Sequence, residues 1–149
     1  MQEVFTQNPD FCLGLRGAKV RRYIYDRFIE LGRGFKSLKP QNGFLSPYAI
    51  NQSGMVHAKA AVGLGTLINA GASIHHEVHV GKFCDIGPGA VLLGKAVVGD
   101  ACEIGRGAII LPNVVLGNRV VVGAGVVVSK DFGYNLTIKG IPAKNKSEW

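Results

Sequence analysis

The sequence predicts an all-β protein built mainly as a parallel β-helix of six-residue repeats, and three observations lead to this fold class. Counting in sixes from Phe44 reaches an aliphatic or aromatic residue fifteen times in succession, as far as Val128. The residues two positions earlier are small, from Gly54 to Val126. Most of the residue pairs at the corners contain Gly, Pro, Asn or Asp, which suit tight turns. A period of six fits neither an α-helix nor a single strand, but it fits a coil of stacked repeats.

The first 43 residues precede the repeat and predict a small β-α-β segment. Short strands are expected at residues 11–15 and 35–38. Between them, residues 18–31 carry apolar side chains at helical spacing, and Gly32 is placed to end the helix. A unit of this size is too small to be stable alone. We therefore expect it to pack on the repeat or on another subunit.

Residues 44–131 are expected to form the β-helix itself. The period runs from Phe44 to Ser129 without an insertion, and three hexads would close one triangular coil of 18 residues. Coils about 4.8 Å apart would make a prism roughly 23 Å tall. Residues 132–149 are expected to add a last strand at 136–138 and a tail.

Composition and charge narrow the function classes. The 149 residues are 47% hydrophobic and 18% charged, which is typical of one globular domain. The net charge is +7, but the cations are scattered without interleaved aromatic residues, so we expect a phosphate-rich small ligand rather than nucleic acid. No apolar stretch would span a bilayer and no signal peptide opens the chain, so we expect a cytoplasmic protein without a membrane part. The cysteines follow no zinc spacing, and Cys84 and Cys102 fall in small inward positions of the repeat.

One corner of the predicted coil carries residues that a tight turn does not explain. His76 can accept a proton near neutral pH, and the adjacent carboxylate of Glu77 can orient the imidazole and stabilise its charged form. Gly94 follows 18 residues later and should lie over His76, where its unobstructed backbone N–H could stabilise an oxyanion. Asn69 projects outward on the neighbouring face and could bind a substrate. Taken singly, these residues could equally be a solvated corner, a turn glycine and a member of an asparagine ladder.

Two stretches of the chain are similar to those of known enzymes. One contains Ile68-Asn-Ala-Gly-Ala-Ser-Ile-His-His-Glu-Val-His-Val-Gly81 and continues to Gly94, and the other is the ending Gly140-Ile-Pro-Ala-Lys144. With them, residues 44–144 resemble the left-handed β-helix of hexapeptide-repeat acyltransferases. More narrowly, they resemble the bacterial sugar acyltransferases typified by sialic acid O-acetyltransferase and bacillosamine N-acetyltransferase. The left hand of the coil comes from this resemblance, because the usual rule for parallel crossovers favours the right hand.

The resemblance implies an acetyltransferase that works as a homotrimer, with acetyl-CoA in the groove between adjacent β-helices. The acceptor would be an amino group or hydroxyl of a sugar or nucleotide sugar. His76 would be the general base, Glu77 its hydrogen-bonded partner, and Gly94 the donor to the thioester carbonyl. Asn69 corresponds to an active-site asparagine, and Asp85 stands where some relatives have a second histidine, so both are expected to contact the acceptor.

The resemblance is weaker for the sites that would hold the nucleotides. Relatives begin with a Rossmann-like domain that helps to hold the nucleotide sugar, and residues 1–43 resemble only its last part. Basic residues and backbone groups of the later coils are candidates for binding acetyl-CoA. These candidates are Gly105, Arg106, Gly123, Ala124, Lys130 and Lys144.

Two other functions remain open on the sequence. His57 and His75 are one coil apart, with His76 and His79 nearby, and carbonic anhydrases on this fold bind zinc through three histidines from two subunits. Their histidine spacing is not reproduced here, so we expect no metal. The other alternative is a non-catalytic, structural β-helix, which would be favoured if the shortened N-terminal segment has left an inactive chain.

Overall fold

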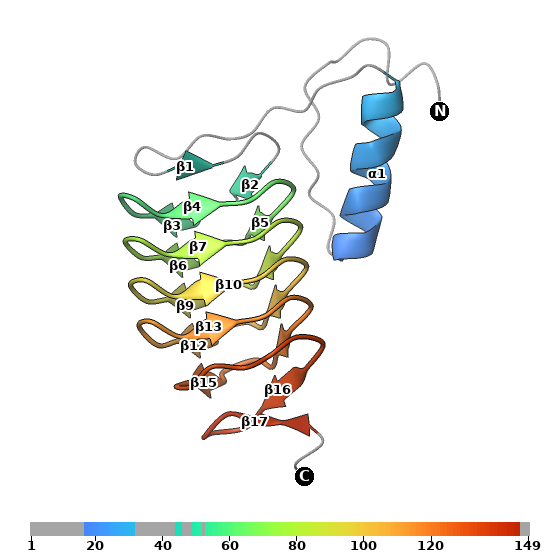
Figure 1. The fold of residues 1–149 in the computed structure, drawn as a ribbon. Helices are drawn as coiled ribbons and strands as arrows, with labels where there is room; N and C mark the ends of the chain where they lie inside the picture. Colours follow the sequence, from blue (N-terminus) through green and yellow to red (C-terminus); the bar gives the residue numbers. More distant parts are fainter. Residues whose placement is uncertain (1–16, 32–43, 46–48, 52, 147–149) are drawn as a thin grey trace.

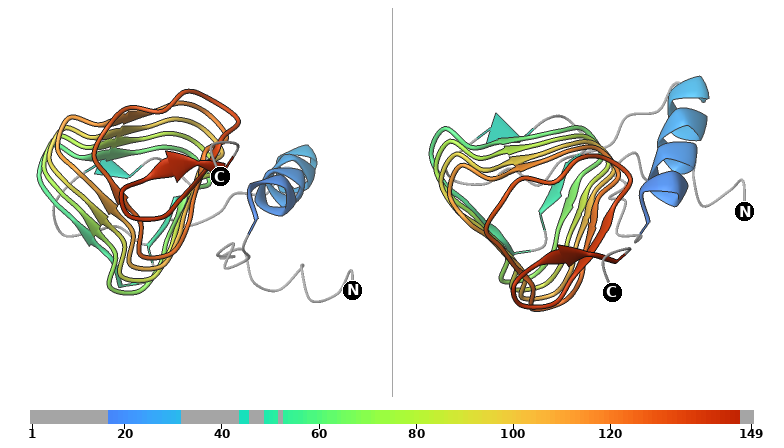
Figure 2. Two further views of the ribbon diagram at one scale, coloured as in Figure 1. Left: turned by 90° about the horizontal axis from the view of Figure 1, so that it is seen from below. Right: turned by 60° about the horizontal axis from the view of Figure 1, so that its bottom comes forward.

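The computed structural model describes residues 17–31, 44–45, 49–51 and 53–146, and it contains one helix beside a triangular coil (Figure 1). The coil is a left-handed parallel β-helix of about five turns, which confirms the predicted fold class. From β1 to β15, each hexad contributes one two-residue strand to one of three flat faces, and the corners between the strands are tight turns. Viewed along its axis, the coil is a triangle (Figure 2).

The three faces are parallel sheets that run the length of the prism. The first face contains β1 (Phe44–Leu45), β4 (Ala61–Val62), β7 (His79–Val80), β10 (Val97–Val98) and β13 (Val115–Leu116). The second face contains β2 (Ile50–Asn51), β5 (Leu67–Ile68), β8 (Asp85–Ile86), β11 (Glu103–Ile104), β14 (Val121–Val122), β16 (Thr137–Lys139) and β17 (Lys144–Asn145). The third face contains β3 (Met55–Val56), β6 (Ser73–Ile74), β9 (Val91–Leu92), β12 (Ile109–Ile110) and β15 (Val127–Val128).

The second residue of each repeat strand from β3 to β15 points into the prism, because successive side chains of a strand point to opposite sides. Ile68, Ile86 and Leu92 are completely buried there, and the small side chains of Ala90 and Cys84 fill the spaces before the strands. Full burial of one such aliphatic side chain stabilises the fold by about 1.5–3 kcal/mol. The repeated hexad therefore builds one continuous core along the axis.

The first coil departs from the predicted period by one residue. Leu45 rather than Phe44 holds the register position of an inward residue, and Asn51 rather than Ile50 does so in β2. The next corner is one residue shorter than the others. The Asn51 side chain spans it, donating to the Gly54 carbonyl at 2.9 Å and accepting from the Gly54 N–H at 2.7 Å. The expectation of an unbroken period from Phe44 is therefore wrong for its first two members.

Helix α1 (Ala18–Glu30) lies beside the second face, as all three views show (Figures 1 and 2). The predicted helix at 18–31 is confirmed, whereas the strands expected at 11–15 and 35–38 and the cap at Gly32 lie outside the described residues. The side chains of Ile24 and Tyr25 pack on Leu67, and the Tyr25 ring meets the edge of Phe83 with centroids 6.0 Å apart. Helix and coil thus share a small apolar contact.

The C-terminal strands close the far end of the coil. The strand expected at 136–138 is confirmed as β16, which pairs in parallel with β14. The sequence did not predict β17, which turns back and pairs antiparallel with β16. In both views of Figure 2 this last strand lies across the end of the triangular section. Phe132 is 9% exposed and belongs to the core cluster near this end.

Candidate active site

Two neighbouring coils bring His76 against Gly94 at the corner between the third and first faces. We call this place the histidine corner and define it as residues 75–77 and 94–95. A Cβ built on Gly94 would lie 2.6 Å from His76 Cε1 and 2.7 Å from Nε2, so the ring covers the glycine at close range. The Lys95 N–H donates to the His76 carbonyl at 3.1 Å and fixes the two corners in register. The predicted stacking of the two residues is therefore present.

The two ring nitrogens of His76 face different partners. Nδ1 lies 3.9 Å from Glu77 Oε1, which is longer than a hydrogen bond, and Nε2 lies on the Gly94 side. Both side chains are exposed, at 63% and 41%, so small rotations would bring the imidazole and the carboxylate together. Lys95 Nζ is also 3.9 Å from Glu77 Oε2. No described residue accepts a hydrogen bond from the Gly94 N–H.

Glu77 has a left-handed backbone with a φ of 59°, a conformation that is uncommon for residues other than glycine. Lys59, Lys95 and Asn113 hold the equivalent position in other coils and have φ values of 61–63°. The left-handed conformation is thus a property of this turn throughout the coil. It is not strain concentrated at the histidine corner.

The imidazole of His75, within the histidine corner, stacks on that of His57 from the preceding coil, with centroids 4.8 Å apart and planes inclined by 28°. Burial lowers the pKa of His75, and the nearby His57 and His76 lower it further. The predicted stacking is confirmed, yet no group of three or more His, Cys, Asp or Glu side chains within the described residues could hold a metal ion. Within a single chain, the described residues therefore supply no complete ligand set of this kind.

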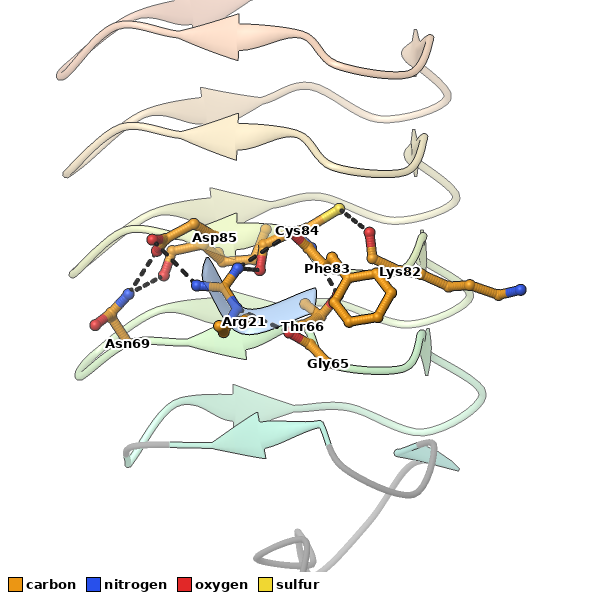
Figure 3. A network of polar contacts seen from close by, with 9 residues as sticks. Arg21, Gly65, Thr66, Asn69, Lys82, Phe83, Cys84 and Asp85 are labelled. Carbon is orange, nitrogen blue, oxygen red and sulfur yellow. Dashed lines mark hydrogen bonds and ion pairs between the residues drawn. The ribbon is translucent and has the colours of Figure 1, made fainter. Parts of the chain in front are cut away.

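Asn69 and Asp85 meet each other on the second face, away from the histidine corner (Figure 3). The Asn69 amide donates to Asp85 Oδ1 at 3.0 Å and to the Ile86 carbonyl at 2.9 Å. Asp85 is only 5% exposed, and its other oxygen lies 3.6 Å from Arg21 Nη1. Asn69 and His76 stand at opposite ends of the third face in one coil. They cannot act on the same atom within one chain.

Arg21 is the residue of this region that the sequence analysis did not single out. It is completely buried although it projects from α1, the one described helix. The sequence did hold a sign that Arg21 faces the coil, because it precedes the apolar residues Ile24, Tyr25 and Phe28 by three, four and seven residues. That spacing marks the buried side of a helix. Asp85, which occupies the outward position of β8, is its charged counterpart.

The candidate cofactor residues lie on two corners and on the last strand. Between the second and third faces, Gly105 and Gly123 stack so closely that a Cβ on Gly105 would lie 2.6 Å from the Ala124 nitrogen. Arg106 and Ala124 are exposed at this corner. Lys130 lies at the same corner of the prism as His76, in a coil nearer the C-terminus, with its ammonium 5.4 Å from the centre of the Phe132 ring. Lys144 is exposed on β17.

The corner between the second and third faces carries glycine at the same position in four successive coils, after Ser53 at that position in the first. We call it the glycine corner, and it consists of Gly71, Gly89, Gly107 and Gly125. All four have φ values between 63° and 69°, which glycine adopts without strain. A Cβ on any of the last three would meet nothing within 4 Å. Another molecule could therefore approach the backbone closely along this corner.

Two further findings concern the helix and the cysteines of the described residues. No helix among those residues has the length and apolar character needed to cross a membrane. Cys84 and Cys102 are free and buried in the core. The Cys102 side chain and burial raise the pKa of the Cys84 thiol, so it stays protonated and unreactive near neutral pH.

Comparison with known families and proteins gives one family match. A model described as bacterial transferase hexapeptide (six repeats) matches residues 95–130. A comparison with curated proteins gives no match. The family match covers the later coils, including Gly105 and Arg106.

Solved structures are similar over nearly the whole chain. The acetyltransferase domain of PglB from Neisseria gonorrhoeae is 31% identical with a TM-score of 0.74, and the match covers 94% of this chain and 73% of that one. The same domain in complex with acetyl coenzyme A is 29% identical with a TM-score of 0.71, covering 97% and 75%.

Two further structures extend the comparison. A histidine-to-asparagine variant of perosamine N-acetyltransferase from Caulobacter crescentus, in complex with CoA and GDP-perosamine, is 25% identical with a TM-score of 0.81, covering 92% of this chain and 69% of that one. WeeI from Acinetobacter baumannii is 18% identical with a TM-score of 0.87, covering 97% and 75%, and supports the fold alone.

Proposed function

Because the chain belongs to the hexapeptide-repeat β-helix acyltransferases, we propose that it transfers an acetyl group from acetyl-CoA to an amino group of a nucleotide-linked sugar. The relatives that support this are the PglB domain in complex with acetyl coenzyme A and perosamine N-acetyltransferase in complex with CoA and GDP-perosamine. The observation that carries the proposal is the contact of the His76 ring with Gly94. It pairs a base with a free N–H one coil away.

The reaction is a direct transfer with both substrates bound. The acceptor nitrogen attacks the thioester carbonyl carbon while His76 Nε2 takes a proton from it, and Glu77 on the other side of the ring stabilises the imidazolium. The carbonyl oxygen gains negative charge and accepts a hydrogen bond from the Gly94 N–H. The carbon–sulfur bond then breaks, and the coenzyme A sulfur takes the proton from His76. No enzyme nucleophile is needed, in keeping with the buried thiols of Cys84 and Cys102.

The two corners of the third face suggest how the cofactor is held. The histidine corner and the glycine corner lie at opposite ends of this face, so a homotrimer would bring the histidine corner of one protomer near the glycine corner of the next. Between the corners, the outward side chains of Val91, Ile109 and Val127 are apolar and half-buried, which suits subunit packing. We place acetyl-CoA between two adjacent protomers of such a trimer, against the backbone of the glycine corner, with its phosphates near Arg106 and Lys130.

Purified protein tests the proposal in a thiol-release assay with acetyl-CoA and a panel of amino-sugar nucleotides, with mass spectrometry of the product. His76→Gln should lower kcat at least about a hundredfold, because general-base catalysis contributes about 10²–10⁴-fold. His79→Gln is the matched control, since His79 is exposed on the same coil and faces the Glu77 carbonyl. If His76→Gln keeps a near-normal rate, His76 is not the base. If no acceptor of the panel releases thiol, the substrate class is wrong.

A further inference from the structure

A buried charge joins helix α1 to the second face of the coil (Figure 3). Arg21 Nε donates to the Gly65 carbonyl at 3.0 Å, and Nη2 donates to the carbonyls of Phe83 and Cys84 at 3.1 and 2.7 Å. These bonds fix the plane of the guanidinium. The remaining nitrogen, Nη1, is thereby directed toward Asp85. The geometry of three backbone carbonyls thus places a cation beside this carboxylate.

Asp85 is held on its other side by Asn69. One Asp85 oxygen faces Arg21 at 3.6 Å, and the other accepts a hydrogen bond from Asn69 at 3.0 Å. Burial lowers the pKa of Arg21, and the attraction of Asp85 opposes that effect. A buried carboxylate beside a buried guanidinium is stable only when both are paired and hydrogen-bonded. Asp85 therefore presents a fixed acceptor to the Asn69 amide.

This arrangement determines which way the Asn69 amide faces. Both protons of Nδ2 are used, one by Asp85 and one by the Ile86 carbonyl. A flipped amide would place its oxygen against a carboxylate and a carbonyl, which are both acceptors, so that orientation is excluded. Oδ1 consequently points away from the network, as Figure 3 shows, and no described residue donates a hydrogen bond to it.

We propose that Arg21 and Asp85 are positioning residues that lock the Asn69 amide with its oxygen outward, as an acceptor for an N–H or O–H group of a bound substrate. This inference rests on the proposed acetyltransfer and adds the side-chain lock behind one of its substrate contacts. Two groups could supply the donor, namely the acceptor sugar and an amide of acetyl-CoA. In either case the contact is made at Asn69 and is set by a residue of α1.

Steady-state kinetics of a double-mutant cycle test the lock. Asp85→Asn keeps the shape of the side chain but can offer a donor, so the Asn69 amide is free to flip. Both Asp85→Asn and Asn69→Ala should raise one KM about tenfold with little change in kcat, which corresponds to the loss of one hydrogen bond. The double variant should be no worse than either single variant, because both remove the same interaction. The KM that rises identifies the donor as the sugar or as acetyl-CoA.

A control variant and a second readout separate the lock from plain structural support. Asp100→Asn alters a carboxylate that accepts the Lys82 N–H at 2.8 Å and lies away from Asn69, and it should leave both KM values unchanged. Additive effects in the cycle, or unchanged KM values in Asn69→Ala, would overturn the proposal. Solvent exchange of the Asn69 side-chain amide protons, followed by NMR, should be slow in the native protein and fast in Asp85→Asn. If the protein is inactive on every acceptor, the proposed function fails, and equal exchange in the two proteins would still overturn the lock.

Discussion

Replacing Gly94 with alanine should remove most of the activity without unfolding the protein. The new Cβ would lie 2.6 Å from His76 Cε1, whereas carbon atoms pack at about 3.5–4.0 Å. The imidazole must therefore withdraw by roughly 1 Å, a displacement that can cost about a hundredfold in rate. A hundredfold corresponds to about 2.7 kcal/mol in the activation barrier. The methyl group would also crowd the proposed oxyanion donor.

The fold should tolerate the same change. His76 is 63% exposed, so its ring can move into solvent, and substitutions of this kind usually change stability by no more than about 0.5 kcal/mol. The assay is thiol release from acetyl-CoA with the best acceptor, together with the Tm from thermal unfolding. Gly133→Ala is the matched control, because a Cβ at Gly133 would meet nothing within 4 Å. It should match the unaltered protein in both measurements.

Three results would refute this reasoning. A turnover of Gly94→Ala within about threefold of the unaltered protein would show that the ring and the N–H are not both needed where we place them. An equal loss of activity in Gly133→Ala would show that the assay responds to disturbance of the coil in general. A large fall in Tm for Gly94→Ala alone would mean that the corner cannot move as its exposure indicates.

Three further predictions concern the coil. Ile110→Ala should lower the free energy of unfolding by about 2–5 kcal/mol in denaturant titrations, because Ile110 is completely buried. Gly63→Ala should lower Tm well below that of Gly133→Ala, since its Cβ would lie 2.6 Å from the Gly81 backbone; equal Tm values would contradict this. The pKa of His75 is lowered in the folded chain, so the unfolded chain binds more protons and stability should fall as the pH drops below about 6.5. His75→Gln should reduce that fall in thermal unfolding at several pH values.

The parts of the structure that follow from the repeat could be predicted from the sequence. Eighteen residues separate Gly94 from His76, and because each coil holds three hexads, that spacing alone places one residue over the other. The same arithmetic places the buried row that includes Ile86 and Ile104. The place of such a residue follows from the 18-residue repeat alone, because the backbone of each coil repeats that of the coil before it.

The remaining features depend on contacts that the period does not describe. The burial of Arg21 requires a helix far away in the sequence to dock on β8, where Asp85 balances its charge. The register shift at Asn51 depends on a side chain spanning a shorter corner. Because Asn51 is polar, a search for apolar residues at every sixth position could not place it at the inward position that it holds. The reversal of the chain into β17 comes from a segment without any hexad pattern.

The last strand also determines how far the coil can grow. A solenoid lengthens by repeating one parallel register, so a bare end is a template on which an identical molecule could stack into fibres. In this protein the chain reverses in β17 and crosses the terminal triangle, running against the direction of β16. Another parallel layer would have to displace it. The strand β17 therefore blocks parallel stacking of another coil on that end of the prism.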